Sequence, residues 1–274
     1  MVKYMGNVKS RAEPGKDHEK SQDYHTIGSN FCIIADGVTG KKAGDVAAKA
    51  VVDYLEPRLT QESESWNSEN VDQNLVSLLA DANKYVRKLG QKKASTRDMR
   101  ASALIVLIVG DEVYFAPVGD CGAYVITNDG ELEKMTEEQT HTSLLVKRGI
   151  VGKNALYTHP TRAMLTGSIG MEKDPKVKVT SKPLSEIKYL LAASDGILKY
   201  VPEEDIEDIF ENCESLEDAL NMLFKIWASP EKVSRMHAEV DKEKTYDEHL
   251  EAKSREDDAT AIIMENMVEG SQNE

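Results

Sequence analysis

The chain has 274 residues, and its 34 lysines and arginines are outnumbered by 48 aspartates and glutamates, which gives a formal net charge of −14 at pH 7. Such a charge repels nucleic acid and anionic lipid, so we expect neither nucleic acid nor a membrane as a partner. The N-terminal residues MVKYMGNVKSRAEPGKDHEK contain no apolar run that could form a signal-peptide core, and no segment is apolar over the length of a membrane span. We therefore expect a cytoplasmic protein, and a monomer.

The first predicted elements are a strand and two helices. Residues 30–35 form a short apolar run that predicts a strand ending at Asp36. A helix is expected next, because apolar side chains then recur on one helical face, with Pro57 close to the helix end; they are Ala43, Val46, Ala47, Ala50, Val51, Tyr54 and Leu55. Residues 61–70 are polar enough for a loop, and residues 71–89 predict a second helix beside the first.

Strands dominate the middle of the chain. Residues 102–109, 113–118 and 123–127 are apolar runs with turn signals around them, so we expect three neighbouring strands of one antiparallel sheet. A short helix is predicted over residues 137–148. Residues 149–175 are rich in glycine and proline and predict an irregular surface loop, a kind of segment that often carries function.

The C-terminal part contains two more predicted strands, residues 189–193 and 259–264, with an amphipathic helix at 216–227 between them. Residues 229–256 are almost wholly polar or charged and predict a solvated helix or an insertion, and residues 266–274 predict a polar tail. We see no internal repeat, and we expect one domain over residues 1–274.

Three of the predicted strands carry an aspartate at one end. Asp36 and Asp195 follow apolar runs, and Asp257 precedes one. Several ionised carboxylates brought together need a cation, and oxygen ligands without histidine or cysteine favour Mg²⁺ or Mn²⁺. The glycines after Asp36 and Asp195 would let the chain turn sharply and a ligand approach closely. Taken singly, each Asp-Gly pair is also a common turn.

Four motifs in order strengthen this interpretation: D-G-V-T-G, V-G-D-C-G-A-Y, A-A-S-D-G-I and D-D-A-T-A-I-I. Together they resemble the metal-dependent type 2C protein phosphatase family, in particular its bacterial-type members. The resemblance covers nearly the whole chain. It implies an α+β fold, a four-layer α-β-β-α sandwich of two packed antiparallel sheets, with two metal ions at one end.

The resemblance also implies roles for single residues. Asp36 would bridge both metals, the carbonyl of Gly37 would bind one of them, and Asp195 and Asp257 would bind the other. Asp23 resembles the early acidic residue that reaches a metal through water, and a turn residue before the next strand is the alternative.

Asp120 stands where some bacterial-type members bind a third, weaker metal, and a structural turn is the alternative. Asp258 stands where the family commonly has asparagine.

Two positions depart from the family pattern. Many members have an arginine five residues before the early aspartate to hold the substrate phosphate, whereas this chain has His18, in the G-x-x-H pattern of a bacterial-type subgroup. Eukaryotic members often have histidine where this chain has Val38, so its general acid is unknown. His141 and His159 lie near the irregular loop and are either substrate contacts or ordinary surface residues. Arg162, the one arginine of that loop, is a candidate phosphopeptide contact.

These observations predict a protein serine/threonine phosphatase that hydrolyses phosphoserine and phosphothreonine in proteins by attack of a metal-bridging water. A cysteine-dependent phosphatase is excluded, because the arginine that it needs six positions after its cysteine is missing after all three cysteines. Two alternatives remain. One is a pseudophosphatase that binds phosphoprotein or metal without turnover; the other is an acidic interaction domain whose aspartates are surface turns.

Overall fold

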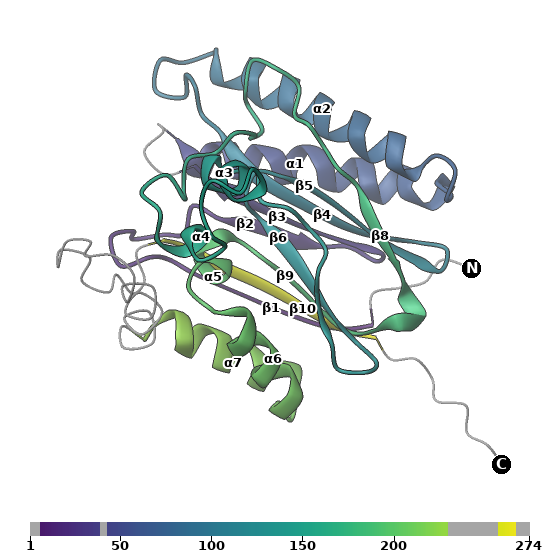
Figure 1. Ribbon diagram of the computed structural model, residues 1–274. Helices are drawn as coiled ribbons and strands as arrows, with labels where there is room; N and C mark the ends of the chain where they lie inside the picture. The colour runs from purple at the N-terminus through teal and green to yellow at the C-terminus, as the bar shows by residue number, and fades with distance from the viewer. Residues whose placement is uncertain (1–5, 39–42, 230–256, 267–274) are drawn as a thin grey trace.

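The computed structural model describes residues 6–38, 43–229 and 257–266. Two five-stranded antiparallel sheets lie face to face between helical layers (Figure 1). The first sheet has the order β2 (Tyr24–Ile27), β3 (Phe31–Gly37), β4 (Ala101–Val109), β5 (Glu112–Val118) and β8 (Thr180–Pro183). The second has the order β1 (Asn7–Glu13), β10 (Ala259–Glu265), β9 (Ile187–Ala193), β6 (Gly122–Thr127) and β7 (Leu132–Lys134).

The central strands are apolar on both faces because both faces are buried. In β3, Ile33 and Ala35 pack in the core beneath the helices of the first sheet, whereas Cys32 and Ile34 pack in the core between the two sheets. Successive side chains of a strand point to opposite faces, so an uninterrupted apolar run is what a doubly covered strand requires.

Each sheet has its own helical layer. α1 (Gly44–Glu62) and α2 (Val71–Gly90) cover the first sheet, and α6 (Glu203–Asn212) and α7 (Leu216–Trp227) cover the second, as Figure 1 shows above and below the strands. Trp227 is completely buried in the second layer. The predicted α-β-β-α sandwich of two antiparallel sheets is therefore confirmed.

One predicted sheet assignment is wrong. β4 and β5 pair as expected, but β6 belongs to the other sheet, where it pairs with β7 and β9. The connection from β5 to β6 passes through Gly119, whose φ of 95° is open to glycine and strained for other residues. This turn takes the chain from the first sheet to the second. The apolar pattern of β6 would fit either sheet, so the sequence could not show the change.

Polar and short elements were missed by the sequence prediction. β1 is an edge strand with mostly polar side chains, so it has no apolar run to reveal it. β7, β8 and α6 were not expected either, and α1 continues past Pro57 to Glu62. The remaining short helices are η1 (Ser63–Ser65), α3 (His141–Lys147), α4 (Ala155–Thr158), η2 (Leu184–Glu186) and α5 (Asp195–Leu198). The expected insertion at 229–256 and tail at 266–274 lie, apart from their first residues, outside the described residues.

Candidate metal centre

Aspartates from both sheets meet at one end of the sandwich. Carboxylate oxygens of Asp36, Asp120 and Asp195 all lie within 4.8 Å of one another. The charges of Asp23 and Asp257 also act on Asp36. We call these five residues the acidic cluster. It contains every aspartate that the sequence proposed as a metal ligand, so the alternative in which these residues are unrelated surface turns is wrong.

Strand pairing places the members from the first sheet. Asp36 lies in β3 opposite Ser102 of β4. Asp120 follows β5, and its Oδ1 accepts a hydrogen bond of 2.7 Å from the Ser102 hydroxyl. Adjacent strands therefore hold the carboxylates of Asp36 and Asp120 side by side, with Ser102 between their backbones.

A hydroxyl links the two sheets at the cluster. Ser194, at the end of β9, donates a hydrogen bond of 2.8 Å to Asp23 Oδ2 and accepts one of 2.9 Å from the backbone N–H of Thr260. Asp195 follows directly and begins α5, while Asp257 precedes β10. The ends of β9 and β10 thus deliver two carboxylates of the second sheet beside those of the first.

Two glycines permit close approach of neighbouring backbone segments at the cluster. A Cβ on Gly37 would lie 2.4 Å from the carbonyl carbon of Gly44, at the start of α1. A Cβ on Gly196 would lie 2.0 Å from the carbonyl oxygen of Asp258. Only glycine fits either contact, and each contact brings a neighbouring segment against the cluster. The structure thus gives these glycines a packing role that the sequence prediction did not include.

Burial raises the pKa of every carboxyl in the cluster. Burial, with hydrogen bonds opposing it and the charge of Asp195 adding to it, raises the pKa of Asp23 from 3.8 to about 7. The pKa of Asp257 rises to about 6, chiefly through burial and then the charge of Asp23. The pKa of Asp36 is raised well above its usual value by burial and by all four of the other carboxylates. The cluster therefore holds more negative charge than its surroundings stabilise.

The cluster fits a divalent cation. In the described part of the chain, Asp23 Oδ1 and Asp195 Oδ1 are buried without a hydrogen-bond partner. Unpartnered carboxylate oxygens in a buried acidic site are good ligands for a hard cation, and the cation would repay the cost of burial. The structure therefore brings together a set of aspartates that can bind metal.

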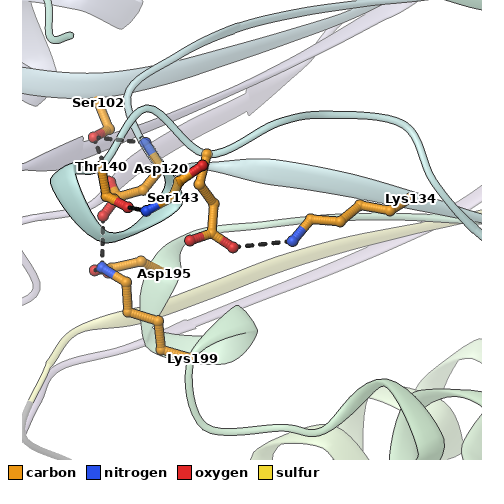
Figure 2. A network of polar contacts seen from close by, with 8 residues as sticks. Ser102, Asp120, Lys134, Thr140, Ser143, Asp195 and Lys199 are labelled. Carbon is orange, nitrogen blue, oxygen red and sulfur yellow. Dashed lines mark hydrogen bonds and ion pairs between the residues drawn. The ribbon is translucent and has the colours of Figure 1, made fainter. Parts of the chain in front are cut away.

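Lys199 is a member of this site that the sequence prediction missed. Its Nζ lies 2.6 Å from Asp120 Oδ2 and 2.5 Å from Asp195 Oδ2, and only 7% of its side chain is exposed. Figure 2 shows the ammonium between the two carboxylates, with Ser102 on the other side of Asp120. Burial acts to lower the pKa of Lys199, but the two carboxylates outweigh it and raise the pKa well above its usual value. The available signal was a lysine four residues after Asp195, one helical turn away.

Asp258 organises the loop that carries His18. Asp258 Oδ1 accepts a hydrogen bond of 2.7 Å from the backbone N–H of Gly15, and its Oδ2 accepts one of 2.6 Å from the N–H of Gln22. His18 Nδ1 lies 3.0 Å from the same Oδ1, and His18 Nε2 lies 3.1 Å from Gln22 Nε2. The imidazole is thus held from both sides next to the segment that delivers Asp257.

The predicted irregular loop, residues 149–175, overlaps a segment that is anchored at the acidic cluster. We call residues 140–168 the flap segment. Before it, the N–H of Gln139 donates to the carbonyl of Gly119; after it, Ile169 and Ala101 exchange backbone hydrogen bonds of 2.8 and 3.1 Å. Gly119 and Ala101 flank Asp120 and Gly37 in the first sheet, so both ends of the flap segment lie at the cluster. Figure 1 shows its helices α3 and α4 at the same end of the sheets as α5.

The candidate substrate contacts in the flap segment form hydrogen bonds within the segment. His141 and His159 each contact the Thr161 hydroxyl, at 3.1 and 2.9 Å, within the segment. Arg162 is half-buried and donates its backbone N–H to the carbonyl of His159. Among the described residues, no ion pair or hydrogen bond joins any of these three side chains to the acidic cluster. Their proposed contact with a substrate stays a prediction.

Cys121 follows Asp120 but is chemically silent. The thiol is buried, and burial together with the charges of Asp36 and Asp120 raises its pKa well above the ordinary value. A thiol held in its neutral form is a poor nucleophile and a poor metal ligand. The reactive groups of the site are therefore its oxygens.

Comparison with known proteins gives matches over most of the chain. The family described as Protein phosphatase 2C matches residues 15–242. Serine/threonine phosphatase stp of Listeria welshimeri is 25% identical over 213 residues, which cover 76% of this chain and 84% of the relative. Protein phosphatase PhpP of Streptococcus pneumoniae is 25% identical over 217 residues, which cover 77% of this chain and 87% of the relative.

Solved structures share the fold. Serine/threonine phosphatase Stp1 from Staphylococcus aureus superimposes with a TM-score of 0.80 at 24% identity, over 97% of this chain and 98% of that one. The serine/threonine phosphatase PstP/Ppp of Mycobacterium tuberculosis gives a TM-score of 0.75 at 18% identity, over 94% and 97%. None of the helices in the described part of the chain has the length and apolar character that crossing a bilayer requires.

Proposed function

Since the chain belongs to the protein phosphatase 2C family, we propose that it hydrolyses phosphoserine and phosphothreonine in protein substrates at the acidic cluster. The observation that carries this proposal is the convergence of Asp36, Asp120 and Asp195 within 4.8 Å, in the family whose sequence pattern the chain follows. The aspartates that the sequence resemblance gives as metal ligands lie in one cluster, which supports the proposal. Nothing in the site favours the alternative of a pseudophosphatase.

We propose two divalent ions, Mg²⁺ or Mn²⁺, as the cofactors. Asp36 would bridge them, the Gly37 carbonyl would bind one, Asp195 and Asp257 would bind the other, and Asp23 would act through water. The absence of nitrogen and sulfur ligands in this set supports hard cations. Bound ions would supply the positive charge that neutralises the carboxylates and the substrate phosphate, and would lower the pKa of a bound water.

The chain's own residues would position the reactants. Ser194 donates to Asp23 Oδ2, so the Asp23 carboxylate is oriented with its Oδ1 directed away from this bond and open to a ligand. Ser102 donates to Asp120 Oδ1 and helps to fix the orientation of that carboxylate. Fixed carboxylates do not have to reorganise when ions and substrate arrive, which is how a preorganised site gains rate.

His18 remains our candidate for contact with the substrate phosphate. Asp258 and Gln22 hold its ring, and 20% of its side chain is exposed to solvent. A ring held by two hydrogen bonds loses little freedom on binding substrate. Arg162 of the flap segment is the second candidate on the substrate side, with its backbone fixed by His159.

The test is Mn²⁺-dependent hydrolysis of p-nitrophenyl phosphate and of phosphoserine and phosphothreonine peptides. We expect Asp36→Asn to lower kcat/KM by at least about a hundredfold, the lower range for losing one electrostatic group of a catalytic site. Asp129→Asn, which changes an exposed aspartate of the β6–β7 turn, is the matched control and should keep full activity. A protein that binds Mn²⁺ but hydrolyses neither substrate would support the pseudophosphatase instead. Unchanged activity and metal affinity in Asp36→Asn would remove the acidic cluster from the mechanism.

A further inference from the structure

Lys199 is the one cation whose side chain the structure pairs with two carboxylates of the acidic cluster, among the residues that it describes. Its ammonium lies between Asp120 Oδ2 and Asp195 Oδ2, at 2.6 and 2.5 Å, and all three side chains are at most 8% exposed. Figure 2 shows the ammonium placed between carboxylates from the two sheets, Asp120 after β5 and Asp195 after β9. The sequence resemblance associates this same aspartate, Asp120, with a third and weaker metal.

The contacts of Asp120 leave it little capacity for a further cation. Its Oδ1 accepts the hydrogen bond from Ser102, and its Oδ2 accepts the one from Lys199. Asp195 differs, because its Oδ2 is bound to Lys199 whereas its Oδ1 is buried without a partner. Asp195 can therefore serve a metal on its free side while it keeps the lysine, and Asp120 would have to exchange the lysine for a metal.

The backbone holds Lys199 in this position. It stands four residues after Asp195, and its backbone N–H donates a hydrogen bond of 2.8 Å to the carbonyl of Asp195. Side chains at this spacing lie on the same side of a helical turn. A buried ammonium has no water to return to, so leaving the two carboxylates would cost more than the exchange of a surface ion pair. A small metal ion would have to displace a tethered cation.

We propose that Lys199 is a resident cation that fills the third metal position, so that this centre takes two divalent ions and not three. The proposal rests on the proposed function for the two remaining ions. It assigns Lys199 a positioning role: its charge keeps Asp120 and Asp195 together when no metal is bound, and makes a third metal unnecessary. The ammonium carries one positive charge and three donors, which suffice for two carboxylates at these distances.

The test counts bound ions, by calorimetric titration of chelator-treated protein with Mn²⁺ and by metal analysis after dialysis against Mn²⁺. We expect two ions for the unmodified protein and two for Lys199→Arg, which keeps the charge. Lys199→Gln removes the charge but keeps a donor, and should bind three ions. The double variant Lys199→Gln with Asp120→Asn should return to two, because the vacated position then lacks a carboxylate.

The outcomes separate the two proposals. Three ions on the unmodified protein, or two on a folded Lys199→Gln, overturn the resident cation and leave the phosphatase proposal standing. No saturable Mn²⁺ site on the unmodified protein overturns both. If Lys199→Gln does not fold without metal, its stoichiometry is measured after refolding in Mn²⁺, and circular dichroism confirms the fold. Three ions on the unmodified protein would overturn the resident cation even without that variant.

Discussion

The two sides of the acidic cluster are both buried, but they balance their charge differently. On the side that we call the paired side, Lys199 lies between Asp120 and Asp195. On the open side, neither Asp23 nor Asp36 forms an ion pair with any residue that the structure describes, and the pKa of Asp23 rises to about 7, mainly through burial. The comparison teaches that burial alone does not make a metal site, because a protein can neutralise a buried carboxylate with its own cation.

The largest effect is expected from breaking the paired side. Lys199→Met would leave two buried carboxylates facing each other, and losing one partner of a buried ion pair costs about 3–5 kcal/mol of unfolding free energy. The measurement is urea unfolding of the chelator-treated protein at pH 7.5, followed by circular dichroism.

Lys49 provides a matched control for this variant. It pairs with Asp53 four residues along α1, but both side chains are 54% exposed. Lys49→Met should leave the urea midpoint nearly unchanged, because exposed ion pairs contribute little. Equal losses from both lysines, or no loss at Lys199, would contradict the distinction between a buried and a surface pair.

The open side predicts an unusual pH dependence for the metal-free protein. The folded pKa of Asp23 is about 7, above the 3.8 of an unperturbed aspartate, so between these values the folded state binds more protons than the unfolded state. The free energy of unfolding should therefore fall as the pH rises from about 4 to about 7. Three pKa units at about 1.4 kcal/mol each set an upper limit of about 4 kcal/mol for this one group.

Urea unfolding in chelator at pH 5 and pH 8 measures this slope. Asp23→Asn should flatten it and should stabilise the metal-free protein at pH 8, which is the opposite sign to the loss from Lys199→Met. Mn²⁺ should restore stability mostly at the higher pH, since binding to carboxylates competes with protons. Stability that rises from pH 5 to pH 8 in the metal-free protein would show that the open side is already neutralised.

The aspartates at the strand ends are the part of the site that the sequence predicts best. Asp36, Asp195 and Asp257 each stand at the end of an apolar strand. The buried strands of a sandwich all end at the same two edges of the layers. Aspartates at strand ends on one edge therefore lie close together, whatever the loops between them look like. The apolar runs also predicted the layers correctly. They failed for β1, whose polar residues pair at an edge, and for β6, whose pattern fits either sheet.

The paired side depends on contacts that no local pattern reveals. Lys199 follows Asp195 by one turn, a spacing that usually marks an exposed pair such as Lys49 and Asp53. Lys199 is buried against Asp120, which follows β5 of the other sheet, directly after the turn at Gly119. Asp258 is similar, since its partners Gly15 and Gln22 lie more than two hundred residues away in the sequence. Long-range partners of this kind require the folded structure.

The smallest effect is expected at Asp258. Its negative charge is stabilised neither by a lysine, as on the paired side, nor left for a metal, as on the open side, but by backbone hydrogen bonds. It has neither a lysine nor an open oxygen, because the backbone N–H groups of Gly15 and Gln22 donate to its two oxygens. Asp258→Asn keeps one acceptor but turns an amide NH₂ towards one of these donors, at a cost of roughly 1–2 kcal/mol. The same variant should also make the His18 ring less fixed, because His18 Nδ1 lies 3.0 Å from Asp258 Oδ1.

The urea unfolding midpoint, together with separate measurement of KM and kcat, tests this role. If Asp258 acts on the substrate side by positioning His18, Asp258→Asn and His18→Ala should both raise KM for a phosphopeptide and leave the Mn²⁺ stoichiometry at two. If Asp258 were instead a metal ligand, the variant would lower Mn²⁺ affinity as strongly as Asp257→Asn does. KM and Mn²⁺ affinity together thus decide whether the Asp258 carboxylate binds metal or positions the His18 loop. Neither measurement relies on the loss of activity alone.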